Sequence, residues 1–234
     1  MNTIIINVLC EGQTEERFVK DVLKPYFKSA GIVLKHRLLM TSKKKNAHGG
    51  MLSYRQAKCD LVTWIKENSM RKSESHYYTT MFDFYALPDD FPGFDDATKC
   101  SDPYDKVKKL EEAFKKDINF DMFIPYIQLH EFEALCFCDI RIMGNLYPEA
   151  KKQIEQLVNV LNDYNGNPEL INNSPQTAPS KRIVSAIEKN NKYHYNKPIS
   201  GASVTKQIGM EKMNEMCRHF REWIELLLAY STVL

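Results

Sequence analysis

The stretch TIIINVLCEGQTEERFV, residues 3–19, contains the change of pattern that decides the fold. Residues 3–9 are rich in β-branched side chains and almost all apolar, which is typical of a short strand buried on both faces of a parallel sheet. After a turn, residues 15–30 carry apolar side chains at helical spacing, and Thr14 stands in the N-cap position. A buried strand that leads directly into an amphipathic helix predicts an α/β fold.

The same alternation continues through the first half of the chain. Further strands are predicted at residues 32–40, 77–83 and 122–129, and amphipathic helices at residues 53–68 and 104–116. Strands that alternate with helices are joined by right-handed crossovers. The pattern therefore predicts a mostly parallel four-stranded sheet flanked by helices.

The strand signal ends near residue 138, and the remaining chain is predicted to be helical. Two stretches rich in Asn, Pro and Gly interrupt it, and the second of them, residues 196–209, is predicted to be a linker. A single helix is predicted at residues 211–230. We therefore predict an α/β domain over residues 1–138 and a helical extension over residues 139–234 that packs on it.

The composition excludes several classes of protein. Of the 234 residues, 43% are hydrophobic and 26% are charged, which fits neither a disordered nor a fibrous chain. Six cysteines are scattered without a CxxC pair, so neither a zinc site nor a disulfide framework is expected. The net charge of +2 gives no indication for or against nucleic-acid binding. No apolar run approaches the roughly 20 residues that span a bilayer, and no signal peptide is recognised, so we expect a cytoplasmic protein.

Acidic side chains and a histidine follow three of the predicted strands. They are Glu11 after the first strand, Asp83 at the end of the third, and His130, Glu131 and Glu133 after the fourth. In an open parallel sheet, ligands collect at the carboxyl ends of the strands. Carboxylates that meet there repel one another unless a cation lies between them. The spacing predicts a site for Mg²⁺ or Mn²⁺, which bind carboxylate oxygens.

Each of these residues also has a simpler interpretation. Glu15 and Glu16 are favoured in the first turn of a helix by its dipole and by solvent, and this interpretation is preferred for both. Asp83 could belong to the turn that follows its strand, His130 could be a core residue, and Glu131 could start a helix. The simpler interpretation is preferred for each residue alone, and the shared position at strand ends favours the metal site.

Two basic segments could position a phosphate. The loop SKKKNAHGG contains Lys44 and ends in a glycine pair through which the backbone could approach a phosphate, although a solvated loop is the preferred interpretation. The other segment is TAPSKRI, in which Ser180 could cap a helix and Lys181 and Arg182 could form an anion site with its first amide groups. Basic residues at a helix start oppose the dipole, and a bound anion would compensate.

Five segments together carry a family resemblance. They are VLCEGQTEERFV, MFDFYALPDDFPGF, IPYIQLHEFEALCF, TAPSKRI and CRHFREWIELL, and as a set they resemble the bacterial family called domain of unknown function 4276. The first segment also looks like the opening of TOPRIM-type domains. By similarity, the family is grouped with TOPRIM-like metal-dependent nucleases, including the nuclease parts of overcoming-lysogenisation-defect proteins. Its members are often found near ATPases in what look like phage-defence neighbourhoods.

The resemblance assigns places to particular residues. Glu11 stands in the place of the TOPRIM glutamate and Asp83 in the place of the first aspartate of the DxD motif. Tyr85 stands where the second aspartate belongs, and a phenol with a pKa near 10 is a poor ligand for Mg²⁺. Three alternatives follow: Glu131 or Glu133 supplies the missing charge, the site binds metal weakly, or the site does something other than hydrolysis.

The resulting hypothesis is a divergent TOPRIM-like protein that acts as a Mg²⁺- or Mn²⁺-dependent phosphodiesterase on DNA or RNA, in phage defence or nucleic-acid processing. The metal ligands would be Glu11, Asp83 and Glu131, with His130 and Glu133 as reserve ligands or a general base. The phosphate would be held by Ser180, Lys181, Arg182 and Lys44. One alternative is a catalytically degenerate subunit that docks on a partner ATPase or another defence protein. Another is an enzyme that acts on a small nucleotide in a narrow, closed pocket.

Overall fold

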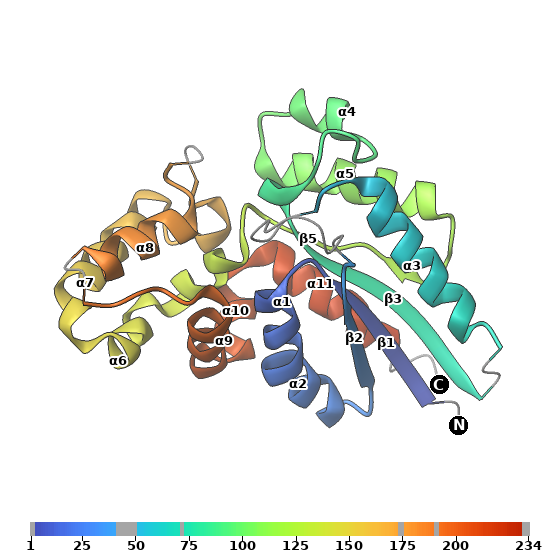
Figure 1. Ribbon diagram of the computed structural model, residues 1–234, viewed down its shortest axis with the longest axis horizontal. Helices are drawn as coiled ribbons and strands as arrows, with labels where there is room; N and C mark the ends of the chain where they lie inside the picture. The colour runs from blue at the N-terminus through green and yellow to red at the C-terminus, as the bar shows by residue number, and fades with distance from the viewer. Residues whose placement is uncertain (1–2, 41–50, 71–72, 173–175, 190–191, 231–234) are drawn as a thin grey trace.

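The computed structural model describes residues 3–40, 51–70, 73–172, 176–189 and 192–230. Its centre is a parallel sheet with the strand order β2-β1-β3-β4, and β5 also pairs with β3 (Figure 1). The strands are β1 Thr3–Cys10, β2 Val33–Leu38, β3 Glu74–Asp83, β4 Phe123–Ile124 and β5 Ile127–Gln128. Every residue of β1 except Thr3 is buried. The predicted α/β fold with a mostly parallel sheet is confirmed.

The last predicted strand is broken in two. β4 and β5 each contain two residues, and Pro125 and Tyr126 lie between them. Proline has no N–H to donate to a neighbouring strand. The side chain of Thr80 on β3 takes over the missing hydrogen bonds, because its Oγ1 accepts from the Tyr126 N–H at 3.0 Å and donates to the Tyr126 carbonyl at 2.9 Å. The segment thus stays hydrogen-bonded to β3, although the regular pairing of backbone groups between the two strands is interrupted.

Helices cover both faces of the sheet (Figure 1). One face packs against α3 Tyr54–Asn68 and α5 Pro103–Ile118, and the short α4 Phe94–Thr98 rests on α5. The other face packs against the first helical segment and against a helix from the end of the chain. These are α1 Gln13–Phe18, a π-helical turn Val19–Leu23, α2 Lys24–Ser29, and α11 Arg218–Ala229.

The predicted linker at residues 196–209 is instead a helix, α9 Lys197–Ile208, which packs against α1. The close approach depends on Gly201: a Cβ atom there would lie 3.0 Å from Cε1 of Phe132 and 3.5 Å from Cγ2 of Thr14. Small residues, which make the segment look like a linker, allow the helix to pack closely. Tertiary contacts therefore stabilise a helix whose small residues give no amphipathic pattern in the sequence.

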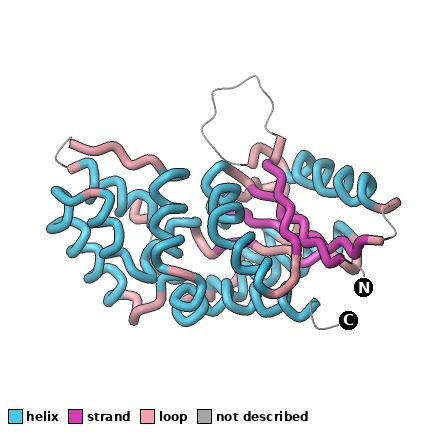
Figure 2. Tube along the Cα trace, turned by 90° about the horizontal axis from the view of Figure 1, so that it is seen from below, coloured by secondary structure: helices cyan, strands magenta, loops and turns pink. Residues whose placement is uncertain are grey.

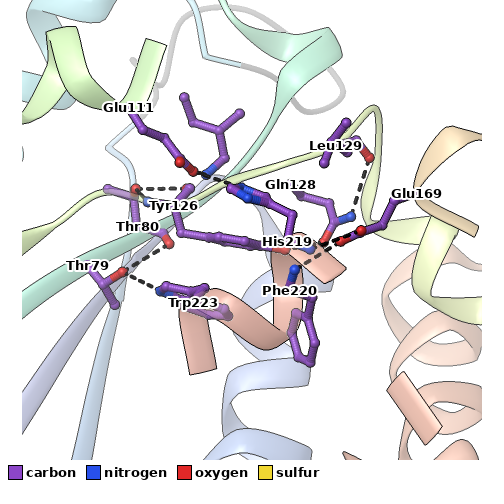
Figure 3. Close-up of polar contacts among 11 residues, drawn as sticks. Thr79, Thr80, Glu111, Tyr126, Gln128, Leu129, Glu169, His219, Phe220 and Trp223 are labelled. Atoms are coloured by element: carbon purple, nitrogen blue, oxygen red, sulfur yellow. Dashed lines mark hydrogen bonds and ion pairs between the residues drawn. The ribbon is translucent and has the colours of Figure 1, made fainter. Parts of the chain in front are cut away.

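The predicted helix at residues 211–230 is two helices, α10 Met210–Met216 and α11. Cys217 between them has an extended backbone, with φ −111° and ψ 99°. The buried carboxylate of Glu169 explains the break, because it accepts from the first N–H groups of α11, those of His219 at 3.0 Å and Phe220 at 2.9 Å (Figure 3). A new helix therefore starts at this point, although the apolar pattern of the sequence continues through it without a break.

Aromatic stacking fixes α11 on the sheet edge (Figure 3). The ring of Tyr126 lies between His219, with centroids 5.1 Å apart, and Trp223, with centroids 4.0 Å apart. Trp223 donates to Thr79 at 2.8 Å, and the His219 ring lies 3.0 Å from the carboxylate of Glu111. The last described helix is thus attached to both the sheet and α5.

The remaining helices form one end of the molecule, away from the strands (Figure 2). They are α6 Met143–Leu146, α7 Lys151–Asp163 and α8 Pro179–Glu188. Short 3-10 helices lie elsewhere along the chain: Phe84–Ala86 directly after β3, and Phe132–Ile142, Pro148–Ala150 and Pro168–Leu170 in the second half. The helical C-terminal region is confirmed, and the hydrophobic core that contains β1 continues into α7, α8, α10 and α11. Within the described part of the chain, no helix is long and apolar enough to cross a membrane.

Candidate functional site

The candidate site lies where β1 and β3 end. β1 leads through α1 and α2 to β2 on one side, whereas β3 leads through α5 to β4 on the other. The crevice between two adjacent strands whose connections diverge is the usual place for a ligand in a parallel sheet. Glu11 follows β1, and its Oε2 accepts from the backbone N–H of Asp83, the last residue of β3, at 2.9 Å. The fold therefore places the first two predicted acids together.

The segment after β5 brings two more carboxylates to the same place. Oδ1 of Asp83 accepts from the N–H of Phe132 at 2.8 Å, which fixes the start of the 3-10 helix Phe132–Ile142 against β3. Glu131 precedes this helix, and its two oxygens accept from the N–H and the hydroxyl of Ser180 at 2.9 and 3.0 Å. Glu133 is 1% exposed. Both residues act electrostatically on Asp83.

Glu15 also belongs to this group, contrary to its preferred interpretation from the sequence. It does serve the start of α1, where its Oε2 accepts from the Gly12 N–H at 2.9 Å. Solvent does not stabilise its charge, however, because the residue is only 6% exposed. We call Glu11, Glu15, Asp83, Glu131 and Glu133 the carboxylate cluster.

Burial and mutual repulsion raise several pKa values in the carboxylate cluster. Burial raises the pKa of Glu11 to about 8, with a further contribution from Glu15. Burial raises the pKa of Glu15 to about 7, and the charge of Glu133 adds to the shift. The pKa of Asp83 is raised well above its ordinary value by burial and by the four glutamates around it. If all five carboxyls were ionised, the cluster would thus carry more negative charge than its surroundings balance.

In the described part of the chain, Lys197 is a cation in contact with the cluster, and the sequence did not single it out. Its Nζ lies 3.2 Å from Oε1 of Glu133. Burial lowers the pKa of Lys197, but the charges of Glu133, Glu131 and Asp83 outweigh this and raise it, so the ammonium group stays charged. The side chain of Asn196 caps α9 by accepting from the Ile199 N–H at 3.2 Å. The sequence Asn-Lys-Pro is a helix-start signal that the predicted linker concealed.

The donor atoms fit a hard divalent cation, although the side chains are not drawn together around one. Among the described residues, no three His, Cys, Asp or Glu side chains are arranged as ligands of a single ion. Carboxylate oxygens are the ligands that Mg²⁺ and Mn²⁺ prefer. The buried carboxylate of Glu133 accepts one hydrogen bond, from Lys197 to Oε2 at 3.3 Å, and its Oε1 has only the ion pair with the same ammonium group. The cluster therefore has the chemistry and the excess charge of a cation site, and Glu11, Asp83 and Glu131 are the residues that would hold it.

His130 lies beside Tyr85. Its backbone has φ 62°, an uncommon conformation for a residue other than glycine, and its Nδ1 lies 3.2 Å from Nδ2 of Asn172. Burial lowers the pKa of His130 to about 4, so the ring is neutral at pH 7. The ring centroids of Tyr85 and His130 are 5.7 Å apart. Burial and the charge of Glu131 raise the pKa of Tyr85, so it too is neutral.

The predicted phosphate-binding residues separate into different environments. Ser180 is buried and bound to Glu131, as described. Lys181 is exposed, and together with Arg182 it lines a depression between α7 and α8 that none of the cluster carboxylates line. Arg182 donates from Nε to the carbonyl of Thr177 at 2.6 Å. Lys44 lies outside the described residues. The structure thus gives Ser180 a role in positioning Glu131 and places the other two on a separate surface.

Comparison with known proteins gives one match. A family described as a domain of unknown function, DUF4276, matches residues 10–228. The match includes every residue of the carboxylate cluster and Lys197. Searches of curated proteins and of solved structures found no match. The function must therefore be argued from the site.

Proposed function

We propose that this chain, which belongs to the DUF4276 family, is a divalent-metal-dependent phosphodiesterase that cleaves nucleic acid. The observation that carries the proposal is the carboxylate cluster: five acidic side chains, from the turn after β1, from α1, from β3 and from the segment after β5, lie together where β1 and β3 end, with Lys197 as their neighbouring cation. Such an arrangement is costly without further positive charge. Its position at the strand ends is where a ligand is expected.

The roles of the residues follow from their contacts. Glu11, Asp83 and Glu131 are proposed to hold the cation, and each is fixed by a hydrogen bond to a backbone N–H. A bound Mg²⁺ or Mn²⁺ would lower the pKa of a water molecule and stabilise charge on the phosphate. Lys197 would remain paired with Glu133 and limit the repulsion between that carboxylate and the others. Tyr85, which is neutral, adds no charge to the site.

The first test removes one negative charge at a time. Glu11→Gln and Asp83→Asn should each abolish Mn²⁺ binding and Mn²⁺-dependent cleavage of DNA and RNA oligonucleotides. Without metal, each variant should melt at the same temperature as the wild type or higher, because the raised pKa values show that the ionised carboxylates are destabilised by their surroundings. Calorimetric titration with Mn²⁺ and thermal melting in EDTA measure the two effects.

Glu16→Gln is the matched control, because Glu16 lies on the same helix but outside the carboxylate cluster. It should bind Mn²⁺ as the wild type does. If Glu11→Gln or Asp83→Asn instead unfolds the metal-free protein, the residue is a structural partner and the metal assignment is wrong. If the wild-type chain binds no Mn²⁺ and cleaves no oligonucleotide, the alternative of a degenerate subunit that docks on another protein replaces this proposal.

A further inference from the structure

A large surface depression lies beside the carboxylate cluster. Its volume is about 570 Å³, and its walls come from the first helical segment, from β2 and from the start of α9. The lining residues include the basic Arg17, Lys20 and His36, the acidic Glu16, and Asn196 and Ile199. We call it the α1–α9 groove, because these two helices lie side by side (Figure 1).

The groove begins next to the residues of the candidate site. On one wall, Gln13 is two residues beyond Glu11, at the first position of α1. On the other wall, Asn196 and Pro198 flank Lys197, whose ammonium group contacts Glu133. A molecule that lies in the groove is therefore led toward the carboxylate cluster.

One wall carries excess positive charge. Arg17, Lys20 and Lys24 recur every three to four residues along the first helical segment, so they share a side of it. In the described part of the chain, Lys20 and Lys24 have no ion-pair partner, and Arg17 lies at 4.0 Å from Asp21. The fourth basic residue, His36, is 3.5 Å from Glu16. The exposed Lys20 and half-buried Lys24 are thus available to an anion.

Lys20 lines the groove, and Lys24 lies one turn farther along the same helical segment. Burial lowers the pKa of His36, and the charges of Lys24 and Lys20 lower it further, although Glu16 opposes them. Both ammonium groups therefore act electrostatically on the His36 ring, which lines the groove. In addition, Nδ1 of His36 is buried without a hydrogen-bond partner.

The opposite wall has different chemistry. It presents the amide of Asn196, the ring of Pro198 and the side chain of Ile199, which is 54% exposed although it is apolar. A chain molecule with anionic groups on one side and planar or apolar groups on the other matches both walls. A nucleic-acid strand has this character, because its phosphates and its bases lie on different sides.

We infer that the α1–α9 groove binds the sugar–phosphate backbone of a nucleic-acid strand, with phosphates against Arg17, Lys20 and Lys24, and leads that strand to the carboxylate cluster. The inference rests on the proposed function and specifies its substrate as a polymer rather than a small nucleotide. A mononucleotide would contact only part of this row of basic side chains, because the row extends along the helix beyond the groove.

The test measures binding without chemistry. Affinity for a fluorescent DNA oligonucleotide and for the matching RNA is measured by anisotropy in EDTA at several salt concentrations. For Lys20→Ala with Lys24→Ala, the slope of log affinity against log salt should become shallower by roughly 0.7 for each single-strand phosphate that no longer meets an ammonium group. The control is Lys109→Ala with Lys116→Ala, which removes the same charge from exposed positions on α5, across the sheet. This control should keep the wild-type slope.

Two readouts separate the failure of this inference from the failure of the proposed function. Equal slopes for the groove variant and the α5 control would overturn the groove, whatever the wild type cleaves. Hydrolysis of bis(p-nitrophenyl) phosphate by the wild type in Mn²⁺ tests the phosphodiesterase activity alone, since this small diester does not need a long binding surface. Circular dichroism and thermal melting of both double variants confirm that they are folded before slopes are compared.

Discussion

Glu15 and Glu16 are neighbours on α1, yet their environments differ completely. Glu15 is buried in the carboxylate cluster and bound to the Gly12 N–H, whereas Glu16 is half-exposed and faces His36. Helix periodicity places consecutive residues about 100° apart, so one of two adjacent acids can point inward while the other remains in solvent. Which of them is buried depends on the position of the helix relative to the sheet, and this is not encoded locally.

At this scale the charge of Glu15 leads to a pH prediction. Its pKa rises from the ordinary range to about 7 in the folded protein, so the folded state holds a proton that the unfolded state has already lost. Stability of the metal-free protein should therefore fall as the pH rises from about 4.5 through 7, and Glu11, with a pKa of about 8, should extend this fall upward. Thermal melting in EDTA across this range measures it.

Glu15→Gln should flatten this dependence, because the amide cannot ionise. Glu16→Gln again provides the control and should keep the wild-type profile. Saturating Mn²⁺ should also reverse the loss of stability at high pH, since a bound cation favours the ionised carboxylates. A metal-free protein whose melting temperature rises between pH 5 and pH 8 would contradict the assignment of Glu15 and Glu11 to a repulsive cluster.

Among the elements, α9 carries the closest packing seen around the site. Gly201→Val should lower the free energy of unfolding by about 1–3 kcal/mol, because its side chain would overlap the Phe132 ring and push α9 away from α1. Chemical denaturation with urea gives the value. Ser203→Val, two residues along the same helix at a half-buried position, separates the steric effect from the lower helix propensity of valine. Equal decreases in the free energy of unfolding of the two variants would mean that the packing at Gly201 is not tight.

The elements also show what the sequence could predict. The strand at residues 3–9 was predicted correctly, and the acids at the ends of β1 and β3 lie together as expected, because a buried parallel strand has a distinctive run of β-branched residues and its end is fixed by the turn. The helix α9 was missed, and with it Lys197, because Pro198, Ser200, Gly201 and Ser203 break the apolar pattern of a segment that folds against Phe132. The contact of Ser180 with Glu131 joins positions 49 residues apart, which no local pattern reveals.

For the whole molecule, the position of α11 makes the end of the chain part of the sheet's core. Phe220 and Trp223 are buried against β-strand residues, and Glu169 loses its N–H partners if the helix is absent. A chain that ends at residue 216 should therefore lose its cooperative thermal transition, because it exposes one face of the sheet and leaves a buried carboxylate without its main partners. Differential scanning calorimetry checks this. A sharp transition near the wild-type temperature would show instead that the α/β domain predicted at residues 1–138 is stable without this helix.

The interrupted strand at Pro125 has a consequence for the behaviour of the protein at high concentration. An open strand edge can recruit a strand from another molecule and start aggregation. Here one edge is cut into two pairs of residues, and the free backbone groups of Tyr126 are already satisfied by Thr80. At the opposite edge, β2 carries Lys35 and Arg37, which resist the approach of an apolar strand. In the described part of the sheet, both borders therefore carry features that oppose the addition of a strand from another molecule.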